Sequence, residues 1–197
     1  MTSWWDESYT GTTPPPWDIG RPQPAFVRLA DEGRLTGTLL DSGCGTGEQA
    51  LLAASRGADV TGIDVAPTAI ERARQKAAER GLSARFEVDD VLDLEQLGRG
   101  FDTVIDCGVF HVFGDEDRGT YVAGLATVLR PGGTCYLMCF SDRQPGDWGP
   151  RRVRADELCA AFNDSWAVQS VTADTLDVNP IEGVTQVAAW LAAIRRE

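Results

Sequence analysis

Short apolar segments alternate with helical segments between residues 38 and 140, and this alternation constrains the fold more than any other feature of the sequence. Residue types and spacing predict strands over residues 38–40, 59–63, 84–88, 101–105 and 134–140. They predict helices over residues 48–55, 68–80 and 118–129. Strands that alternate with helices form βαβ units around a parallel sheet, so we expect an α/β fold with a doubly wound, Rossmann-like sheet.

Beyond residue 140 the pattern is less decisive. A loop with glycine and proline covers residues 141–150, a helix is predicted over residues 154–162, and a half-exposed strand over residues 166–173. Alanine content favours a helix for residues 184–194, whereas the apolar run at the end of that segment also fits a final strand. Residue propensity alone does not decide whether residues 184–194 form a helix or a strand.

The first 24 residues differ in composition from the rest of the chain. They contain three of the six tryptophans and five of the ten prolines, including the run at residues 14–16 that favours an extended polyproline conformation. Tryptophan buries a large apolar area and is uncommon on solvent-exposed tails. We therefore expect this segment to pack over another part of the molecule.

Charge narrows the range of partners. The 197 residues contain 18 Lys and Arg against 30 Asp and Glu, a net charge of −12. This excess of acid argues against nucleic acid and against an anionic membrane surface, because both attract basic residues. An uncharged or cationic small molecule fits better as a partner.

We expect a cytoplasmic protein, because residues 1–9 lack an apolar leader. We also expect a monomer or a weak dimer.

Cysteine and histidine content predicts no metal site. His111 is the only histidine, and the five cysteines are scattered without a Cys-x-x-Cys pair. A zinc site usually needs several such ligands at short spacing. The cysteines are therefore expected to be free thiols, mostly in the core, in a reducing compartment.

A glycine-rich turn, Asp41-x-Gly43-x-Gly45-x-Gly47, lies between the first predicted strand and the following helix. A dinucleotide fingerprint has the spacing G-x-G-x-x-G and seats a pyrophosphate on the helix N-terminus. Here the spacing differs, and Asp41 and Glu48 place negative charge at the turn, which favours a cation over an anion. S-adenosylmethionine carries an ammonium and a sulfonium group and no phosphate, so we predict that it binds here.

Further acids follow the next two strands. Asp64 ends the second strand and can accept hydrogen bonds from both hydroxyls of a ribose. Asp90 follows the third strand and can accept from an adenine amine, while the Val91 amide faces a ring nitrogen. Each acid could instead cap a helix or face solvent. Because ligands of such sheets bind beyond the carboxyl ends of the strands, these acids and the glycine turn together predict one nucleoside site.

Five stretches resemble the successive motifs of class I S-adenosylmethionine-dependent methyltransferases: Leu40–Gly47 (LDSGCGTG), Gly62–Ala66 (GIDVA), Val88–Val91 (VDDV), Phe101–Asp106 (FDTVID) and Leu129–Gly133 (LRPGG). The resemblance implies a seven-stranded sheet of order 3-2-1-4-5-7-6 with strand 7 antiparallel, and therefore strands at the C-terminus. It implies S-adenosylmethionine as cofactor and S-adenosylhomocysteine as product. The residues then expected to contact the cofactor from the core are Asp41, Gly43, Gly45, Gly47, Asp64, Val65, Asp90, Val91, Cys107 and Gly108.

The N-terminal segment carries a narrower resemblance. It resembles the lid of small-molecule methyltransferases related to thiopurine and tellurite-resistance methyltransferases, through Trp5-x-x-x-Tyr9-x-Gly11 and Pro16-Trp17-Asp18-Ile19-Gly20-x-Pro22. The resemblance implies that this lid folds over the methionine end of the cofactor, with Trp5 and Trp17 beside it and Tyr9 close by. The prolines at residues 14–16 depart from the pattern. We accordingly divide one compact domain into a lid and first helix, residues 1–36, and a core, residues 37–197.

The chain also resembles actinobacterial enzymes that methylate heterocyclic toxins and phenol-like molecules. That resemblance implies methyl transfer to O, N or S of a small, aromatic heterocyclic or phenol-like acceptor, by in-line displacement in a closed aromatic pocket. We expect the acceptor pocket to be lined by Tyr9, His111, Phe113 and Trp148.

His111 follows the fourth strand at the mouth of the expected site and is the candidate catalytic residue. An ordinary pKa of about 6.5 suits a general base, although the residue could instead only shape the pocket. A thiolate or an acidic hydroxyl would arrive ionised and need no base. The alternatives are a detoxifying thiol, halide or tellurite methyltransferase, an NAD-dependent oxidoreductase, and a cofactor-binding module without catalysis.

Overall fold

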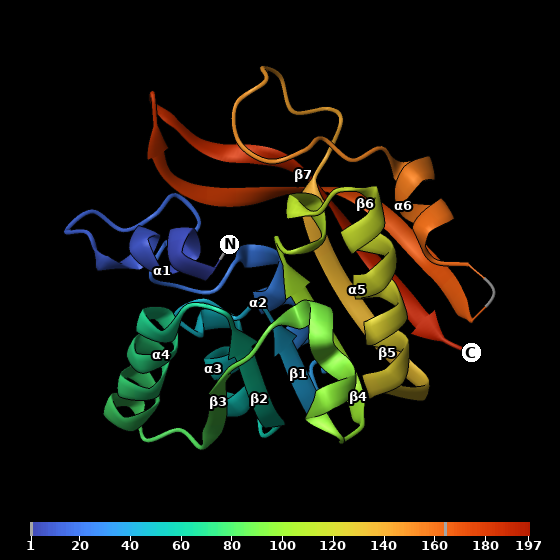
Figure 1. Cartoon of the computed structure of the whole chain (residues 1–197), viewed down its shortest axis with the longest axis horizontal. Coiled ribbons are helices and arrows are strands. Elements are labelled where there is room, and N and C mark those ends of the chain that lie inside the picture. The colour runs from blue at the N-terminus through green and yellow to red at the C-terminus, as the bar shows by residue number, and fades with distance from the viewer. Residues whose placement is uncertain (1, 164) are drawn as a thin grey trace.

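The computed structural model describes residues 2–163 and 165–197. In this part of the chain seven strands form one sheet of order β3-β2-β1-β4-β5-β7-β6 (Figure 1). The strands are β1 (Thr38–Ser42), β2 (Asp59–Asp64), β3 (Ala84–Val88), β4 (Phe101–Cys107), β5 (Leu129–Phe140), β6 (Trp166–Ile181) and β7 (Val184–Arg196). β7 runs antiparallel to both of its neighbours, β5 and β6. The predicted fold class, the strand order and the antiparallel seventh strand are therefore confirmed.

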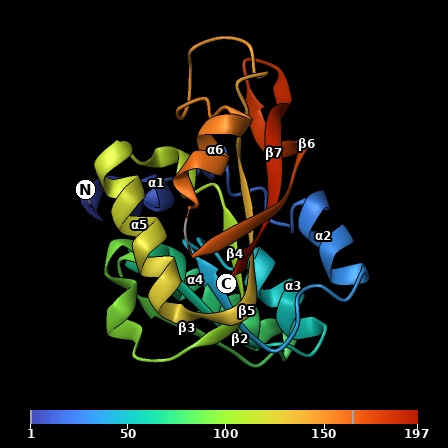
Figure 2. The ribbon, with the colours of Figure 1, turned by 90° about the vertical axis from the view of Figure 1, so that its right-hand side faces the viewer.

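Helices cover both faces of the sheet and bury two apolar cores. One face packs against α2 (Pro24–Asp31), α3 (Glu48–Ser55) and α4 (Pro67–Arg80). The other packs against the 3-10 helix η1 (Val91–Leu97), α5 (Asp115–Val128) and α6 (Ala155–Ala161). Figure 2 shows α5 and α6 on one side of the sheet and α2 and α3 on the other. Within the described ranges, no helix has both the length and the apolar character that crossing a bilayer requires.

Local signals in the sequence fix where α4 begins and ends. Pro67 lies in its first turn, where the missing N–H leaves no hydrogen bond unmade. Ile70, Ala73 and Ala77 form the buried stripe. Gly81 ends the helix with a φ of 63°, a left-handed conformation that favours glycine. The sequence predicts this helix to within one residue at each end.

Two strands exceed their predicted length by several residues, whereas the others differ by two residues at most. β5 begins at Leu129 and β6 continues to Ile181, whereas the pattern predicted strands over residues 134–140 and 166–173. The extra length of β6 comes from a hairpin in which its second half pairs with the first half of β7. Pairing of this kind depends on a partner strand, so a local pattern of alternation does not reveal where it stops.

The tryptophan-rich N-terminal segment is folded onto the core. It begins with α1 (Thr2–Thr10), which packs on α4. The Asp6 carboxylate accepts a hydrogen bond of 2.8 Å from the Thr68 N–H in the first turn of α4. In Figure 1, α1 lies below the far end of the β6–β7 hairpin.

The chain that follows α1 is held against that hairpin by hydrogen bonds to β6, three of which Asn179 donates. The Asn179 N–H donates to the Pro16 carbonyl at 2.8 Å. The Asn179 side-chain amide donates to the carbonyls of Pro15, at 2.9 Å, and Asp18, at 2.8 Å. Three hydrogen bonds therefore tie the segment that carries Trp17 to the end of a strand far away in the sequence.

Candidate active site

A cavity of about 1000 Å³ opens at the carboxyl ends of the parallel strands. Its walls come from α1, the residues that follow it, the glycine turn, the ends of β2 to β5, the loop after β5 and the end of β6. Most of the predicted site residues meet there: Trp5, Tyr9, Trp17, Gly43, Gly45, Asp64, Val65, Asp90, Val91, Cys107, Gly108, His111, Phe113 and Trp148. Of the residues predicted to contact the cofactor, Asp41 and Gly47 lie outside this lining.

Asp41 is 2% exposed and joins β1 to α3 beneath the cavity. Its Oδ2 accepts a hydrogen bond of 2.9 Å from the Ala50 N–H. Burial raises the Asp41 pKa to about 8, although the hydrogen bond from Ala50 lowers it. Asp41 therefore places little formal charge at the turn near neutral pH, in contrast to the charge that its sequence position suggested.

The glycines of the turn allow close packing. A Cβ on Gly47, whose φ is +84°, would lie 2.9 Å from the Phe86 ring. A Cβ on Gly43 would lie 2.2 Å from Val109 Cγ2, and one on Gly45 would lie 2.9 Å from the Tyr9 hydroxyl. Val109, Tyr9 and Phe86 can therefore pack this closely only because these three positions lack a Cβ.

Asp64 is held at the tip of β2 by the backbone around it. Its Oδ2 accepts a hydrogen bond from the Gly45 N–H at 2.8 Å, and its Oδ1 accepts one from the Ala66 N–H at 2.9 Å. Burial raises the Asp64 pKa, and these two hydrogen bonds oppose that rise. The carboxyl group is therefore fixed in orientation where it lines the cavity.

Asp90 combines two of the roles that the sequence allowed. Its Oδ1 accepts a hydrogen bond of 3.0 Å from the Leu92 N–H, so the side chain caps η1. The same residue is exposed and lines the cavity beside Val91. We refer to Asp64, Val65, Asp90 and Val91 as the nucleoside end.

Glu48 opens α3 as predicted, but its charge is balanced inside the protein. Its carboxylate accepts hydrogen bonds of 2.8 Å from Lys76 and from Arg80. Although burial alone would raise the Glu48 pKa, the bonds to Arg80 and Lys76 lower it. The prediction that free negative charge at residue 48 repels a phosphate is therefore not supported, because two basic side chains of α4 compensate it.

An aromatic cluster covers the glycine turn. The Trp17 indole N–H donates to the Tyr9 hydroxyl at 2.9 Å, and the Trp5 and Trp17 ring centroids lie 5.5 Å apart. Trp4 packs edge-on against Trp5 at 4.7 Å and also lines the cavity. Burial raises the pKa of the Tyr9 phenol, so this hydroxyl remains neutral in the folded protein.

The opposite wall of the cavity is also aromatic. His111, in the 3-10 helix η2 (Phe110–Val112), is 6% exposed, and its ring meets Phe140 edge-on at 5.1 Å. Trp148 packs against the same phenylalanine at 6.2 Å. We refer to His111, Phe113, Phe140 and Trp148 as the acceptor wall.

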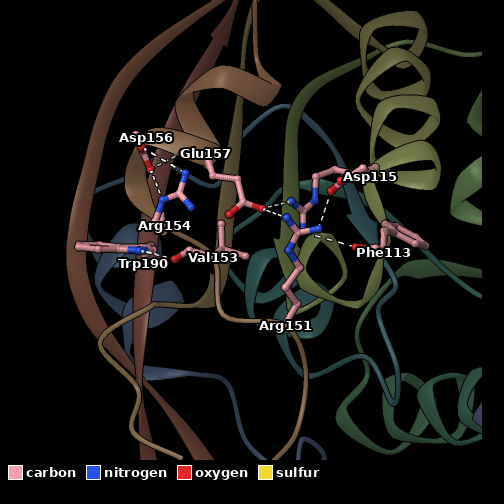
Figure 3. A network of polar contacts seen from close by, with 9 residues as sticks. Phe113, Asp115, Arg151, Val153, Arg154, Asp156, Glu157 and Trp190 are labelled. Carbon is pink, nitrogen blue, oxygen red and sulfur yellow. Dashed lines mark hydrogen bonds and ion pairs between the residues drawn. The ribbon is translucent and has the colours of Figure 1, made fainter. Parts of the chain in front are cut away.

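Two arginines fix the loop that carries Trp148. The Arg152 guanidinium donates to the Pro150 carbonyl at 2.7 Å and to the Trp148 carbonyl at 2.8 Å. Arg151, which lines the cavity, forms ion pairs of 2.5 Å with Asp115 and with Glu157 (Figure 3). The loop after β5 is therefore attached to both α5 and α6.

The sequence motifs do not indicate several residues that line the cavity. They include Val109, Phe140, Leu176, Val178 and Ile181. The last three come from the end of β6, which the hairpin brings over the cavity. A local motif could not have found them, since their position depends on strand pairing.

Comparison with known proteins places the chain among methyltransferases. Residues 39–133 match the family model described as a methyltransferase domain. A 2-heptyl-1-hydroxyquinolin-4(1H)-one methyltransferase from Mycobacteroides abscessus is 35% identical over 183 residues, which cover 88% of this chain and 81% of that protein. A probable thiol methyltransferase 2 from Arabidopsis thaliana is 28% identical over 191 residues, which cover 94% and 83%.

A solved structure is also similar over the whole chain. It comes from work on the conversion of a disulfide bond into a thioacetal group during echinomycin biosynthesis. It is 40% identical with a TM-score of 0.90, and the match covers 100% of this chain and 93% of that one.

The fold and the similarity to these relatives define an S-adenosylmethionine-dependent methyltransferase of class I. Within that class, the chain belongs to the methyltransferase-domain family together with the relatives described above. The nicotinamide-dependent alternative is therefore wrong.

Proposed function

We propose that this chain methylates an oxygen, nitrogen or sulfur atom of a small aromatic heterocyclic or phenol-like molecule. The observation that carries the proposal is that one cavity contains both the nucleoside end and the acceptor wall. Ligand pockets measure roughly 300 to 1000 Å³. A cavity of about 1000 Å³ therefore has room for a nucleoside and a second small molecule.

The residues at one end of the cavity suit the cofactor. Asp64 would accept hydrogen bonds from the ribose hydroxyls, and Asp90 would accept one from the adenine amine. Trp5 and Trp17 would lie beside the methionine end, where aromatic faces attract a positive charge. When bound, the cofactor supplies a methyl group already activated on a sulfonium, so the protein needs chiefly to position the reactants and exclude water.

The acceptor wall suits a flat, apolar partner. Phe140 and Trp148 offer ring faces and edges, and Arg152 holds the Trp148 backbone in place. A rigid wall of this kind orients a planar acceptor and displaces water from it. The relative named as a hydroxyquinolone methyltransferase supports an acceptor of this shape.

Methylation of a thiol is a second candidate. The relative from Arabidopsis thaliana is named as a probable thiol methyltransferase, and the most similar parts of the two chains cover 94% of this one. A sulfur acceptor would use the same cavity and the same in-line displacement.

The direct test is methyl transfer from isotope-labelled S-adenosylmethionine to a panel of hydroxyquinolones, phenols and aromatic thiols, followed by mass spectrometry of the products. We expect at least one hydroxyquinolone or phenol to gain a labelled methyl group. Methylation of thiols alone would favour the second candidate. If none of the panel is methylated by a protein that binds S-adenosylhomocysteine, the proposed acceptor class is wrong.

A further inference from the structure

The His111 ring has a fixed orientation and a fixed proton. Its Nδ1 accepts a hydrogen bond of 2.8 Å from the Phe140 backbone N–H. A backbone amide does not give up its proton, and a ring nitrogen that accepts a hydrogen bond carries none. The neutral imidazole must therefore hold its proton on Nε2.

The protonated nitrogen faces the cavity. His111 Nε2 lies 3.4 Å from where a Cβ on Gly108 would stand, and both residues line the cavity. Glycine at residue 108 keeps that space free for a ligand atom. Within residues 2–163 and 165–197, the hydrogen bonds of His111 leave Nε2 without a protein acceptor.

Burial, aided by nearby positive charges, keeps the His111 ring neutral. Arg118 from α5 and Arg152 from the loop after β5 both act on the imidazole, and Glu157 of α6 is paired with Arg118 at 2.5 Å. Burial, with a smaller contribution from the two arginines, lowers the His111 pKa to about 3. Because Nδ1 is engaged and Nε2 already carries a proton, the imidazole has no lone pair available to remove a proton from an acceptor.

The acceptor wall offers no other base. Among the described residues, those that line the cavity from segments 107–114 and 140–151 include no carboxylate, because Asp142 and Asp147 lie outside the lining. The carboxylates elsewhere in the lining already accept hydrogen bonds within the protein, as Asp64 does from the glycine turn and Asp177 does from Arg21 and Gln186. Arg151 also lines the cavity beside this wall, and its charge is paired with Asp115 and Glu157.

We propose that His111 is a hydrogen-bond donor to the acceptor rather than a base, and that the acceptors are acidic hydroxyls or thiols that bind as anions. This inference rests on the proposed function and specifies its substrate class. The acceptor's oxygen or sulfur anion forms a bond to the methyl carbon as the bond between that carbon and the sulfonium sulfur breaks. The negative and positive charges cancel, and no proton is left to be removed.

The single histidine allows a test that needs no substrate. The chain, purified with a tag free of histidine and labelled with ¹⁵N-histidine, should give one pair of ring nitrogen signals. We expect an unprotonated Nδ1 and a protonated Nε2 that do not titrate between about pH 5 and 8. Titration within that range, or a proton on Nδ1, would overturn the proposal.

Two substitutions separate the two ring nitrogens. In His111→Asn the amide oxygen can replace Nδ1 and accept from Phe140, but no donor reaches the Nε2 position. In His111→Gln the amide nitrogen can replace Nε2 as a donor, whereas the Phe140 N–H loses its partner. We expect the KM for an acidic phenol to rise at least about tenfold in His111→Asn and less than about threefold in His111→Gln. A fall in kcat of at least about 100-fold in both variants would instead identify a base.

The pH dependence of the wild-type enzyme completes the test. The two acceptors are 4-nitrophenol and unsubstituted phenol, which is the weaker acid. We expect the pH profile of kcat/KM for each acceptor to have its midpoint at the pKa of that acceptor. A midpoint common to both acceptors would contradict the inference while leaving the proposed function intact. Failure to bind S-adenosylhomocysteine in calorimetry would instead refute the proposed function.

Discussion

The Trp17 indole N–H donates a hydrogen bond of 2.9 Å to the Tyr9 hydroxyl, and that hydroxyl stands directly over Gly45. One residue of α1 thus holds the tryptophan that follows the proline run and also covers the glycine turn. The hydrogen bond links the N-terminal segment to the site more tightly than packing of the rings alone.

Removal of the Tyr9 hydroxyl should weaken the packing of the aromatic cluster over the glycine turn. In Tyr9→Phe the Trp17 N–H loses its acceptor, so we expect the free energy of unfolding to fall by about 1 kcal/mol. The Kd for S-adenosylhomocysteine, measured by calorimetry, should rise about 3- to 10-fold. Tyr136→Phe removes a hydroxyl outside the cavity lining and serves as the control. Equal affinities of the two variants would show that the Tyr9 hydroxyl does not act on the site.

Asn179 of β6 should also hold the segment that carries Trp17 over the glycine turn. Asn179→Ala removes two donors to the carbonyls of Pro15 and Asp18, while Asn179→Asp places a negative charge against them. We therefore expect affinity for S-adenosylhomocysteine to decrease from the wild type to Asn179→Ala and further to Asn179→Asp. Stopped-flow tryptophan fluorescence should show faster release of the ligand in the same order. If Asn179→Asp released the ligand at the wild-type rate, the hydrogen bonds of Asn179 would not hold this segment over the site.

Asp64 should be needed for the cofactor. In Asp64→Asn an amide N–H₂ replaces one oxygen that now accepts a backbone N–H, so the turn is disturbed and an acceptor is lost. We expect affinity for S-adenosylhomocysteine to fall at least about 100-fold. Asp93→Asn makes the same change of charge at an exposed residue outside the cavity lining, and it should bind normally.

The raised pKa of Asp41 predicts that the free energy of unfolding depends on pH. Its pKa is about 8 in the folded protein and near 4 in the unfolded chain, so the folded state binds more protons between these values. The stability that Asp41 contributes is therefore present below about pH 4 and is lost as the pH rises to about 8. Asn at this position can still accept from Ala50 and does not titrate.

Denaturant unfolding at several pH values checks this expectation. Asp41→Asn should gain stability relative to the wild type as the pH rises from about 4 to 8. The comparison isolates Asp41 from Asp106, whose pKa burial raises to about 6. A difference between the two proteins that does not change with pH would contradict the assignment.

The cofactor should stabilise the fold, whereas a dinucleotide should not. S-adenosylhomocysteine at 100 times its Kd adds about 2.7 kcal/mol to the free energy of unfolding. For a chain of this size that corresponds to a rise in melting temperature of roughly 5 to 11 °C. NADH at the same concentration should leave the melting temperature unchanged, and a rise with NADH alone would argue against the site described above.

The sequence was most informative where chemistry and short-range structure coincide. Asp64, the glycine turn and Asp90 each follow a strand directly, so their meeting at one edge of the sheet could be predicted from the alternation of elements. The acceptor wall was predicted only in part. Phe140 was assigned to a strand, and nothing nearby in the sequence indicated that its ring would pack between His111 and Trp148.

Sequence position alone predicts a negative charge at the turn from Asp41 and from Glu48. In the fold, burial raises the pKa of Asp41, and Lys76 and Arg80 of α4 balance Glu48. Charge on a residue depends on neighbours that the local sequence does not contain, so the predicted cofactor is right although part of the reason for it is not.

The order of the strands separates two tasks in space. The nucleoside end is built by short turns after β2 and β3, whereas the other end is built by the loop after β5 and by the end of the β6–β7 hairpin. Insertions and substitutions in the latter segments would alter selectivity without touching the turns that we propose bind the methyl donor. Such a scaffold lets evolution exchange one acceptor for another while the donor stays the same.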